Sequence, residues 1–271
     1  MGNLYGKRIL VLVPHPDDEV VGCSAAIGRA QAEGSQIFAL YLTHGCIAQD
    51  TLWPWQRKNY GTYVNRRRIE AETVATFLGI TPLNNASNWP DLSARYLWLH
   101  MEAVFQQIQK AIAQNNIDQI WVPAFEGGNA DHDALNAITS LFKGQISILE
   151  FAEYNFHHGK AQSQAFPQPN DTEILLTLSP EERVKKRAAL TLYESEQQNL
   201  NYVKCDRECC RPLASYDYSQ MPHAGKLWYA RFQWVPFRHP RVDFTNPQDV
   251  AKSIQTFLNA KTSALPVAAR Q

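Results

Sequence analysis

The chain has 271 residues, with 26 Lys and Arg against 26 Asp and Glu, so its formal net charge is zero. A neutral chain lacks the positive charge that is typical of proteins that bind nucleic acid or anionic membranes. Hydrophobic residues make up 45% and charged residues 19% of the sequence, which is typical of a globular protein rather than a disordered one.

The apolar runs and the cysteines predict a cytoplasmic protein. The longest aliphatic run, residues 9–13, is too short to span a bilayer and lacks the flanks of a signal peptide. Five cysteines cannot all pair, so we expect reduced thiols. We therefore expect neither an integral membrane segment nor export.

The N-terminal elements predict a βαβ unit. Residues 8–13 form a short apolar run that ends at Pro14, as in a buried parallel strand. An Ala-rich helix over residues 20–33 is closed by Gly34, and residues 36–42 follow as a second strand.

The alternation of helices and strands continues to residue 151. The further elements, each predicted from its periodicity, are helix 64–78, helix 94–115, strand 118–122, helix 131–142 and strand 145–151. Such a series is typical of an α/β fold with a Rossmann-like, doubly wound, mainly parallel sheet and helices on both faces.

The remainder of the chain gives weaker signals. We expect a strand over 173–178, a charged helix over 180–199 and, from the alternation of Trp228, Ala230, Phe232 and Trp234, a half-buried strand. The predicted organisation is one domain over 1–235, with an α/β core over 1–151 and a loop-rich part over 152–235. A C-terminal extension over 236–271 follows, with a frayed tail from residue 260.

The first motif with chemical potential is Pro14-His15-Pro16-Asp17-Asp18-Glu19, in the turn after the first strand. Acidic residues in a first helical turn complement the helix dipole, so capping is one interpretation. Capping does not require an imidazole, however. Adjacent carboxylates point in different directions, so one of them could bind a metal while the other faces a water molecule.

The second motif, Asn129-Ala130-Asp131-His132-Asp133, follows strand 118–122 and a Gly-Gly pair. By itself it is also compatible with a capped helix start. Ligands in open α/β sheets bind beyond the carboxyl ends of strands, where both motifs lie. His15, Asp18 and His132 could therefore converge as three N and O ligands with an open fourth position, as in a catalytic zinc site; Fe²⁺ or Co²⁺ would fit the same ligands.

These motifs resemble the LmbE-like, or PIG-L, family of zinc-dependent N-deacetylases. Further similarities are Thr43-His44-Gly45 after the second strand, Arg68-Ile69-Glu70 with Leu78-Gly79 in the next long helix, and the late helix around residues 187–197. The resemblance implies that His15, Asp18 and His132 bind one Zn²⁺ and that Asp17 is the general base. It also places Asp131 behind the ligands.

Two departures from the family pattern concern catalysis and recognition. Asn129 stands where many members have a histidine that stabilises the oxyanion; an amide can still donate a hydrogen bond, and His223 is the candidate to compensate. Cys46 stands where many members have an acidic residue that contacts the sugar. His44, Cys46 and Arg68 are the candidate substrate contacts.

Three functions remain open at this stage. The first is a zinc-dependent hydrolase of linear amides that removes an N-acetyl or other N-acyl group from an amino sugar such as N-acetylglucosamine, or from a related conjugate. The second is a metal-binding but inactive ligand-binding module, because of Asn129. The third is a structural or thiol-switch protein, in which Cys205, Cys209 and Cys210 form a weak C-x3-C-C pattern. The expected partner is a small molecule rather than a nucleic acid, and the chain could form a homo-oligomer.

Overall fold

A seven-stranded sheet forms the centre of the computed structural model, which describes residues 4–200 and 203–264. The strand order is β3-β2-β1-β4-β5-β9-β8. The first five run parallel, and β9 runs antiparallel to both of its neighbours. The strands are β1 (Arg8–Val13), β2 (Gln36–Tyr41), β3 (Thr81–Pro82), β4 (Gln119–Pro123), β5 (Ser147–Phe151), β8 (Ile174–Thr177) and β9 (Arg207–Pro212), and a separate hairpin consists of β6 (Tyr154–Asn155) and β7 (Gln162–Ser163).

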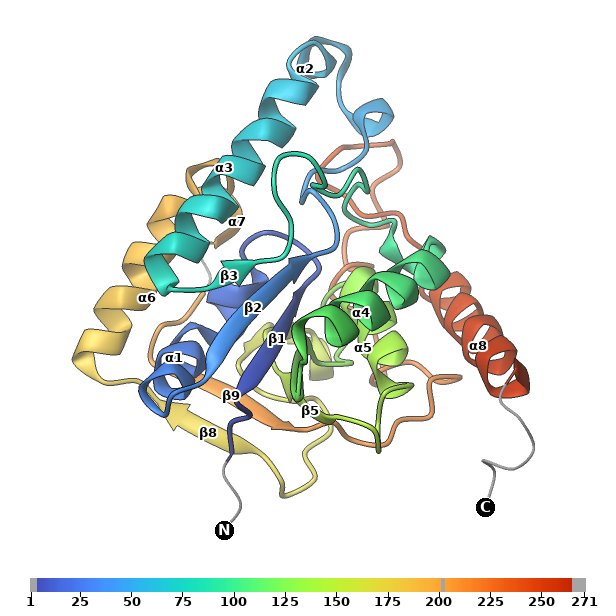
Figure 1. Cartoon of the computed structure of the whole chain (residues 1–271). Helices are drawn as coiled ribbons and strands as arrows, with labels where there is room; N and C mark the ends of the chain where they lie inside the picture. The colour runs from blue at the N-terminus through green and yellow to red at the C-terminus, as the bar shows by residue number, and fades with distance from the viewer. Residues whose placement is uncertain (1–3, 201–202, 265–271) are drawn as a thin grey trace.

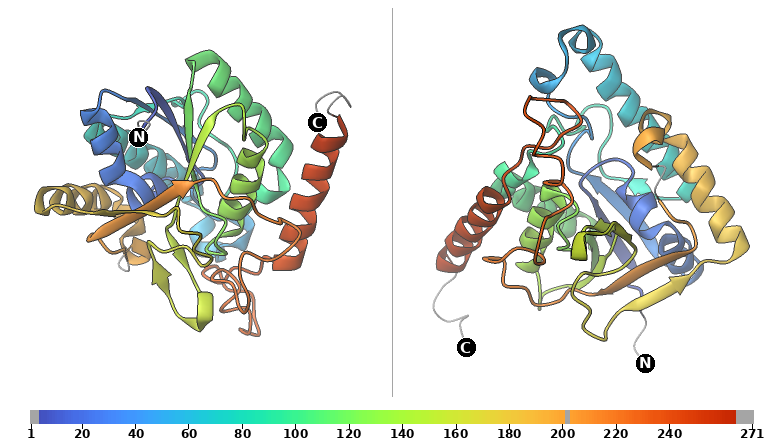
Figure 2. Two further views of the ribbon diagram at one scale, coloured as in Figure 1. Left: turned by 90° about the horizontal axis from the view of Figure 1, so that it is seen from below. Right: turned by 180° about the vertical axis from the view of Figure 1, so that it is seen from behind.

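Helices cover both faces of this sheet (Figures 1 and 2). One face carries α1 (Asp18–Ala32), α3 (Tyr60–Leu78) and α6 (Pro180–Leu192), and the other carries α4 (Met101–Asn115), α5 (Ala130–Ser140) and α8 (Pro247–Ala264). The side chains of β1 alternate between two apolar cores, because successive residues of a strand point to opposite faces. The predicted doubly wound α/β fold is therefore confirmed.

Short helical segments lie in the connections. They are α2 (Pro54–Arg57), α7 (Gln197–Leu200) and the 3-10 turns Gln49–Thr51, Leu97–Leu99, His157–Gly159 and Glu194–Glu196.

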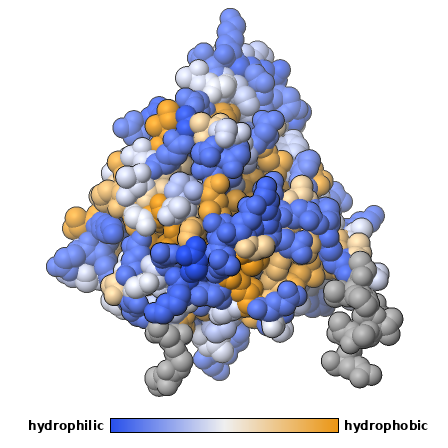
Figure 3. All heavy atoms as spheres, in the orientation of Figure 1, coloured by the Kyte–Doolittle hydropathy of each residue, from blue (hydrophilic) through white to orange (hydrophobic). Residues whose placement is uncertain are grey.

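On the face drawn in Figure 3, apolar residues are scattered among hydrophilic ones. Among the described residues, no helix combines the length and the apolar character needed to cross a bilayer.

The strand order reverses direction at β1. From β1 the chain proceeds outward through β2 and β3, then returns to place β4 and β5 on the other side of β1. The connections after β1 and after β4 therefore leave the same edge of the sheet and diverge, which opens the crevice in which doubly wound folds bind ligands. Both sequence motifs lie in this crevice.

Several expectations for individual elements are wrong. Residues 94–100 do not extend α4; they contain a 3-10 turn and the helix begins at Met101. Residues 228–235 form turns rather than a strand, because their backbone bonds are local, as in Ala230 to Leu227, and Arg231 stacks on the Trp228 ring at 3.6 Å. Residues 260–264, expected to fray, belong to α8; the rest of the expected tail lies outside the described residues.

The three late cysteines do not form a metal site among the described residues. Cys209 and Cys210 are neighbours in β9, and their side chains enter different apolar clusters. Cys205 precedes the strand and is half-buried. All five cysteines are free, and the only group of metal-ligating side chains found in the described part of the chain lies elsewhere.

Candidate metal centre

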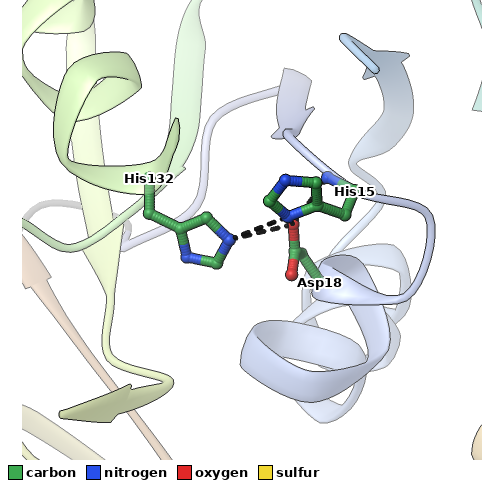
Figure 4. A group of neighbouring side chains, drawn as sticks. All are labelled: His15, Asp18 and His132. Carbon is green, nitrogen blue, oxygen red and sulfur yellow. Dashed lines mark hydrogen bonds and ion pairs between the residues drawn. The ribbon is translucent and has the colours of Figure 1, made fainter. Parts of the chain in front are cut away.

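The loop after β1 is folded by hydrogen bonds between its own residues. The backbone N–H of His15 donates to Asp18 Oδ2 at 2.7 Å, and the N–H of Asp18 donates to the carbonyl of His15 at 3.1 Å. These bonds turn the chain from β1 into α1 within three residues. They also bring the imidazole of His15 and the carboxylate of Asp18 to the same side of the turn (Figure 4).

The loop before α5 is folded in the same way. Asn129 caps the helix, since its Oδ1 accepts the N–H of Asp131 at 2.9 Å. Asp133 Oδ1 accepts the N–H groups of Glu126 and Gly127 at 3.1 and 3.0 Å. A side chain at Gly128 would lie 2.2 Å from the carbonyl oxygen of Tyr154, so this position requires glycine. His132 is thereby held in the first turn of α5 and points toward β1.

The side chains of His15, Asp18 and His132 meet between the two loops (Figure 4). His15 Nδ1 lies 3.2 Å from His132 Nε2 and 3.4 Å from Asp18 Oδ2, and the last two atoms are 3.3 Å apart. Ligand atoms at about 2.0 to 2.1 Å from a tetrahedral zinc ion lie about 3.3 to 3.4 Å from one another. The donor atoms therefore fit three corners of a zinc tetrahedron.

Asp131 lies behind the three donor atoms and orients His15. Its Oδ2 accepts from His15 Nε2 at 2.9 Å, which leaves the lone pair on Nδ1, the atom that faces Asp18 and His132. The N–H groups of Arg95 and Leu97 donate to the same carboxylate at 2.6 and 2.9 Å. Asp131 is fully buried, so its orientation is fixed by these bonds.

The pKa values of His15 and Asp18 indicate that positive charge is favoured between the three donor atoms. Burial opposes a charged ring at His15, but Asp18 and Asp131 raise its pKa to about 10. Burial also opposes a charged Asp18, but His132 and His15 outweigh burial and hold its pKa well below the usual range. The carboxylates thus favour positive charge at the point where the three donor atoms meet, and a divalent cation would supply it.

Asp17 is held beside this group by Arg67. It has a φ of 134°, a conformation that is uncommon for a residue with a side chain and that is often found at functional sites. The Arg67 guanidinium donates to Asp17 Oδ2 at 3.1 Å and to the carbonyl of Pro16. Burial raises the pKa of Asp17 well above its usual range, and Arg67 opposes this rise. A carboxylate with a raised pKa is suited to accept a proton near neutral pH.

A cavity of about 370 Å³ opens over these residues, within the range of small-molecule sites. Its lining includes His15, Asp17, Asp18, Arg67 and Asn129. The side-chain N–H₂ of Asn129 has no hydrogen-bond partner among the described residues, because only its Oδ1 is used by the helix cap. A residue that lines the cavity therefore has an unused hydrogen-bond donor.

Glu153 also lines this cavity and was not expected from the sequence. The side chain is fully buried, and neither carboxyl oxygen has a hydrogen-bond partner in the described part of the chain. Burial, with Asp18 and Glu126 nearby, raises the pKa of Glu153 well above its usual range. A signal for Glu153 is present in the sequence: like His15, it follows the carboxyl end of a parallel strand, since β5 ends two residues before it.

The structure does not bring the expected substrate contacts to the cavity. Gly45 and Ile47 line it, whereas His44 and Cys46, which alternate with them, are buried behind it. His44 Nδ1 accepts the N–H of Cys46 at 3.1 Å, and burial lowers the pKa of His44 to about 4. Burial raises the pKa of the Cys46 thiol to about 12, so this thiol is not reactive at neutral pH.

The arginine at the cavity is Arg67 rather than Arg68. Arg68 is half-buried on the outer side of α3, where it pairs with Glu72 at 2.6 Å. Arg67 shares the buried side of the helix with Ala71, Val74 and Leu78. The helical period of these apolar residues could have distinguished the two arginines, because positions three, four, seven and eleven residues apart share a face.

His223 is placed next to the glycine loop rather than on the cavity. Its Nδ1 lies 2.8 Å from the carbonyl of Ala224, and its Nε2 is buried without a partner among the described residues. A Cβ atom at Gly127 would lie 3.2 Å from this Nε2. His223 therefore packs behind the loop that precedes Asn129, and it does not line the cavity described above.

The chain is similar to a known protein family and to several solved structures. Residues 10–142 match the PIG-L family, described as GlcNAc-PI de-N-acetylase. These residues contain both motifs and all three candidate metal ligands. No curated protein sequence matches the chain.

Three solved structures illustrate the range of proteins that share the fold. The A40926 pseudoaglycone deacetylase is 17% identical, with a TM-score of 0.57, and the match covers 78% of this chain and 99% of that one. The zinc-inhibited form of teicoplanin deacetylase is 14% identical, with a TM-score of 0.54 and the same coverage. The 4-carboxy-2-hydroxymuconate hydratase of Pseudomonas putida is 13% identical, with a TM-score of 0.50, over 78% and 98% of the two chains. At these identities the likeness shows the fold alone.

Proposed function

We propose that this chain, whose residues 10–142 match the PIG-L deacetylase family, is a metal-dependent hydrolase that removes an N-acetyl or other N-acyl group from an amino sugar or a related conjugate. The observation that carries the proposal is the mutual spacing of His15 Nδ1, Asp18 Oδ2 and His132 Nε2, which matches three ligands of one zinc ion.

His15, Asp18 and His132 would hold one Zn²⁺, and Fe²⁺ or Co²⁺ is compatible with the same donor atoms. When bound, the metal would lower the pKa of a water molecule toward about 7 and polarise the amide carbonyl of the substrate. Asp131 would keep His15 in the tautomer that presents Nδ1. The teicoplanin deacetylase described as inhibited by zinc gives a reason to compare metals experimentally.

Asp17 would act as the general base. It lies on the same cavity, its orientation is set by Arg67, and burial raises its pKa well above the usual range, which favours proton acceptance. In the first step Asp17 Oδ would accept a proton from the attacking water. In the second step it would return this proton to the amine nitrogen as the carbon–nitrogen bond breaks.

Asn129 would stabilise the oxyanion. Asn129 lines the cavity, its Oδ1 accepts the N–H of Asp131, and its N–H₂ group has no hydrogen-bond partner among the described residues. A positioned donor of this kind contributes about 10² to 10³-fold to the rate of acyl transfer. His223 does not line the cavity, so we assign the donor role to Asn129 alone.

The test is release of a primary amine from N-acetylated amino sugars by metal-loaded protein. We expect Asp17→Asn to retain the metal and to lose about 10² to 10⁴-fold in kcat. Asp171→Asn makes the same change at an exposed position and should match the unchanged protein. A fully active Asp17→Asn would show that the base is assigned wrongly.

The binding-module alternative makes a different prediction for the same assay. A ligand-binding module would bind metal and an acetylated sugar, yet release no amine from any compound. The similarity in fold to the P. putida hydratase suggests a further control, a hydration assay on 4-carboxy-2-hydroxymuconate. Amine release that depends on Asp17 would argue against both a ligand-binding module and a hydratase.

A further inference from the structure

Two segments beside the cavity concentrate positive charge on a neutral chain. Residues 49–58 and 231–245 together contain five cationic side chains and two acidic ones, whereas the whole chain is balanced at 26 and 26. The same segments carry six Trp and Phe residues, of which all but Trp53 are exposed. We call this surface the aromatic and basic rim; it consists of Trp53, Trp55, Arg57, Lys58, Arg231, Phe232, Trp234, Phe237, Arg238 and Arg241.

Direct contacts join the two segments. The rings of Trp53 and Trp55 stack with centroids 5.5 Å apart, and Trp53 meets the edge of His239 at 5.7 Å. Arg238 lies 3.9 Å from Asp50, in an exposed pair of the kind that contributes little stability. Figures 1 and 2 show the late segment, in orange-red, beside the loop that leads to α2.

Three rings of the rim point to solvent rather than into the cavity. Trp234 is 73% exposed, Trp55 is 69% exposed and Phe237 is 58% exposed. None of the three lines the cavity, whereas Arg231, Phe232 and Arg241 do. The rim is therefore continuous with the cavity mouth but extends beyond any small ligand held there. Large exposed apolar surface of this kind marks an interaction site.

We infer that the aromatic and basic rim docks the protein on an anionic lipid surface, with the cavity mouth facing the headgroups. Trp and Phe partition into the headgroup region of a bilayer, and each neighbouring Lys or Arg adds attraction to anionic lipid. The rim combines both groups on two adjacent loops. The neutral total charge conceals this surface, because the two segments have three more cationic than acidic side chains (five against two) on a chain that is balanced overall.

A second copy of the chain and a single-stranded nucleic acid fit the rim less well than a lipid surface does. In a symmetric dimer through this face, two positively charged surfaces would oppose each other, which is unfavourable. A single-stranded nucleic acid requires rings that line a groove on which bases stack. Among the Trp and Phe residues of the rim, only Phe232 lines the cavity. The rim therefore lacks a groove lined by rings.

The experiment is co-sedimentation of the full chain with vesicles of phosphatidylcholine alone or of phosphatidylcholine with phosphatidylglycerol. We expect binding to the anionic vesicles only, and weakening at high salt. In Lys58→Gln with Arg238→Gln, each lost charge should weaken binding about fivefold. Trp55→Ser with Trp234→Ser should weaken it at least about tenfold. None of these four residues lines the cavity.

Matched controls change similar residues away from the rim. Phe77→Ser removes a ring that is 43% exposed near the other end of α3, and Lys185→Gln removes an exposed charge on α6. Both should bind vesicles normally, and circular dichroism checks that every variant folds. The inference is wrong if anionic vesicles do not bind, or if neither double variant weakens binding. It is also wrong if the double variants instead abolish a dimer in sedimentation velocity or binding to an oligonucleotide.

Discussion

The loops that form the candidate metal centre and the C-terminal part of the chain are stabilised over different sequence distances. In the loops after β1 and β4, the side chains of Asp18, Asn129 and Asp133 bond to backbone groups two to seven residues away. Asp131 is the exception described above, since it accepts the distant N–H groups of Arg95 and Leu97. After β5 the bonds reach much further. Glu208 accepts the N–H groups of Ala25 and Ala26 and pairs with Lys186 at 2.7 Å, and all of these groups are buried.

This difference explains why the first region could be read from sequence and the second could not. A local hydrogen bond requires a particular residue type at a short, fixed spacing, which leaves a motif. A bond between Glu208 and Ala25 requires only that the fold bring them together. Mutations should therefore separate the regions, with metal binding sensitive to the loops and indifferent to the C-terminal core.

The largest effect is expected for His132→Ala. Loss of one of three ligands should weaken metal binding by more than about 100-fold, the upper range for loss of an outer partner alone. Turnover should disappear with the metal. Metal content after dialysis, measured by atomic emission, checks the prediction, and His100→Ala at an exposed position is the control. Full metal content in His132→Ala would remove this residue from the ligand set.

The next largest effect is expected at Asn129, where two roles can be separated. Asn129→Ser keeps an oxygen that can cap α5 but removes the N–H₂ donor, so kcat should fall about 10² to 10³-fold with little change in stability. Asn129→Ala loses both groups and should in addition lower the free energy of unfolding by about 1 kcal/mol. If Asn129→Ser keeps full kcat, the residue is a cap and nothing more.

A smaller loss is expected for Asp131→Asn. The amide cannot accept the proton of His15 Nε2 with the strength of a carboxylate, so the Nδ1 tautomer is less favoured. Metal affinity or activity should fall about 10 to 100-fold, less than for His132→Ala. A titration with a competing chelator measures the affinity. An unchanged affinity would mean that the backbone alone orients His15.

Most of the first half of the fold could be predicted from the sequence. The strands and helices predicted up to residue 151 lie within a few residues of the observed ones, except that the expected start of α4 is a 3-10 turn and α3 begins four residues early. The short strand β3 and the short helix α2 were not predicted. His15, Asp18 and His132 were found because they follow strands that end at the same edge of the sheet. The roles assigned to these residues remain predictions.

The sequence was insufficient where side-chain direction or distant pairing decides the outcome. Arg67 and Arg68 are adjacent, and only the helix phase sends one to Asp17 and the other to Glu72. The alternation of Trp228 and Trp234 suggested a strand, but no strand of residues 4–200 and 203–264 pairs with this segment, and the chain forms turns. Neither outcome depends on residue type alone.

The last prediction concerns pH, where the expected change is small for each pH unit, and it compares the two regions directly. Burial raises the pKa of Asp133 from a usual 3.8 to about 8, although the N–H groups of Gly127 and Glu126 oppose this rise. Between these values the folded chain keeps a proton that the unfolded chain releases. Asp133 therefore makes the free energy of unfolding fall as the pH rises from about 4 to about 8, by at most about 1.4 kcal/mol per pH unit.

Asp133→Asn should remove this contribution, because the amide keeps the Oδ1 acceptor for both N–H groups and does not titrate. Urea denaturation at several pH values, with the metal chelated, measures the slope. Ile254→Val in α8 is the control from the C-terminal region: its side chain is buried in the apolar core, so it should lower stability by about 0.5 to 1.5 kcal/mol at every pH. A slope that is unchanged in Asp133→Asn would mean that another buried acid of the loops, such as Glu126, holds the proton.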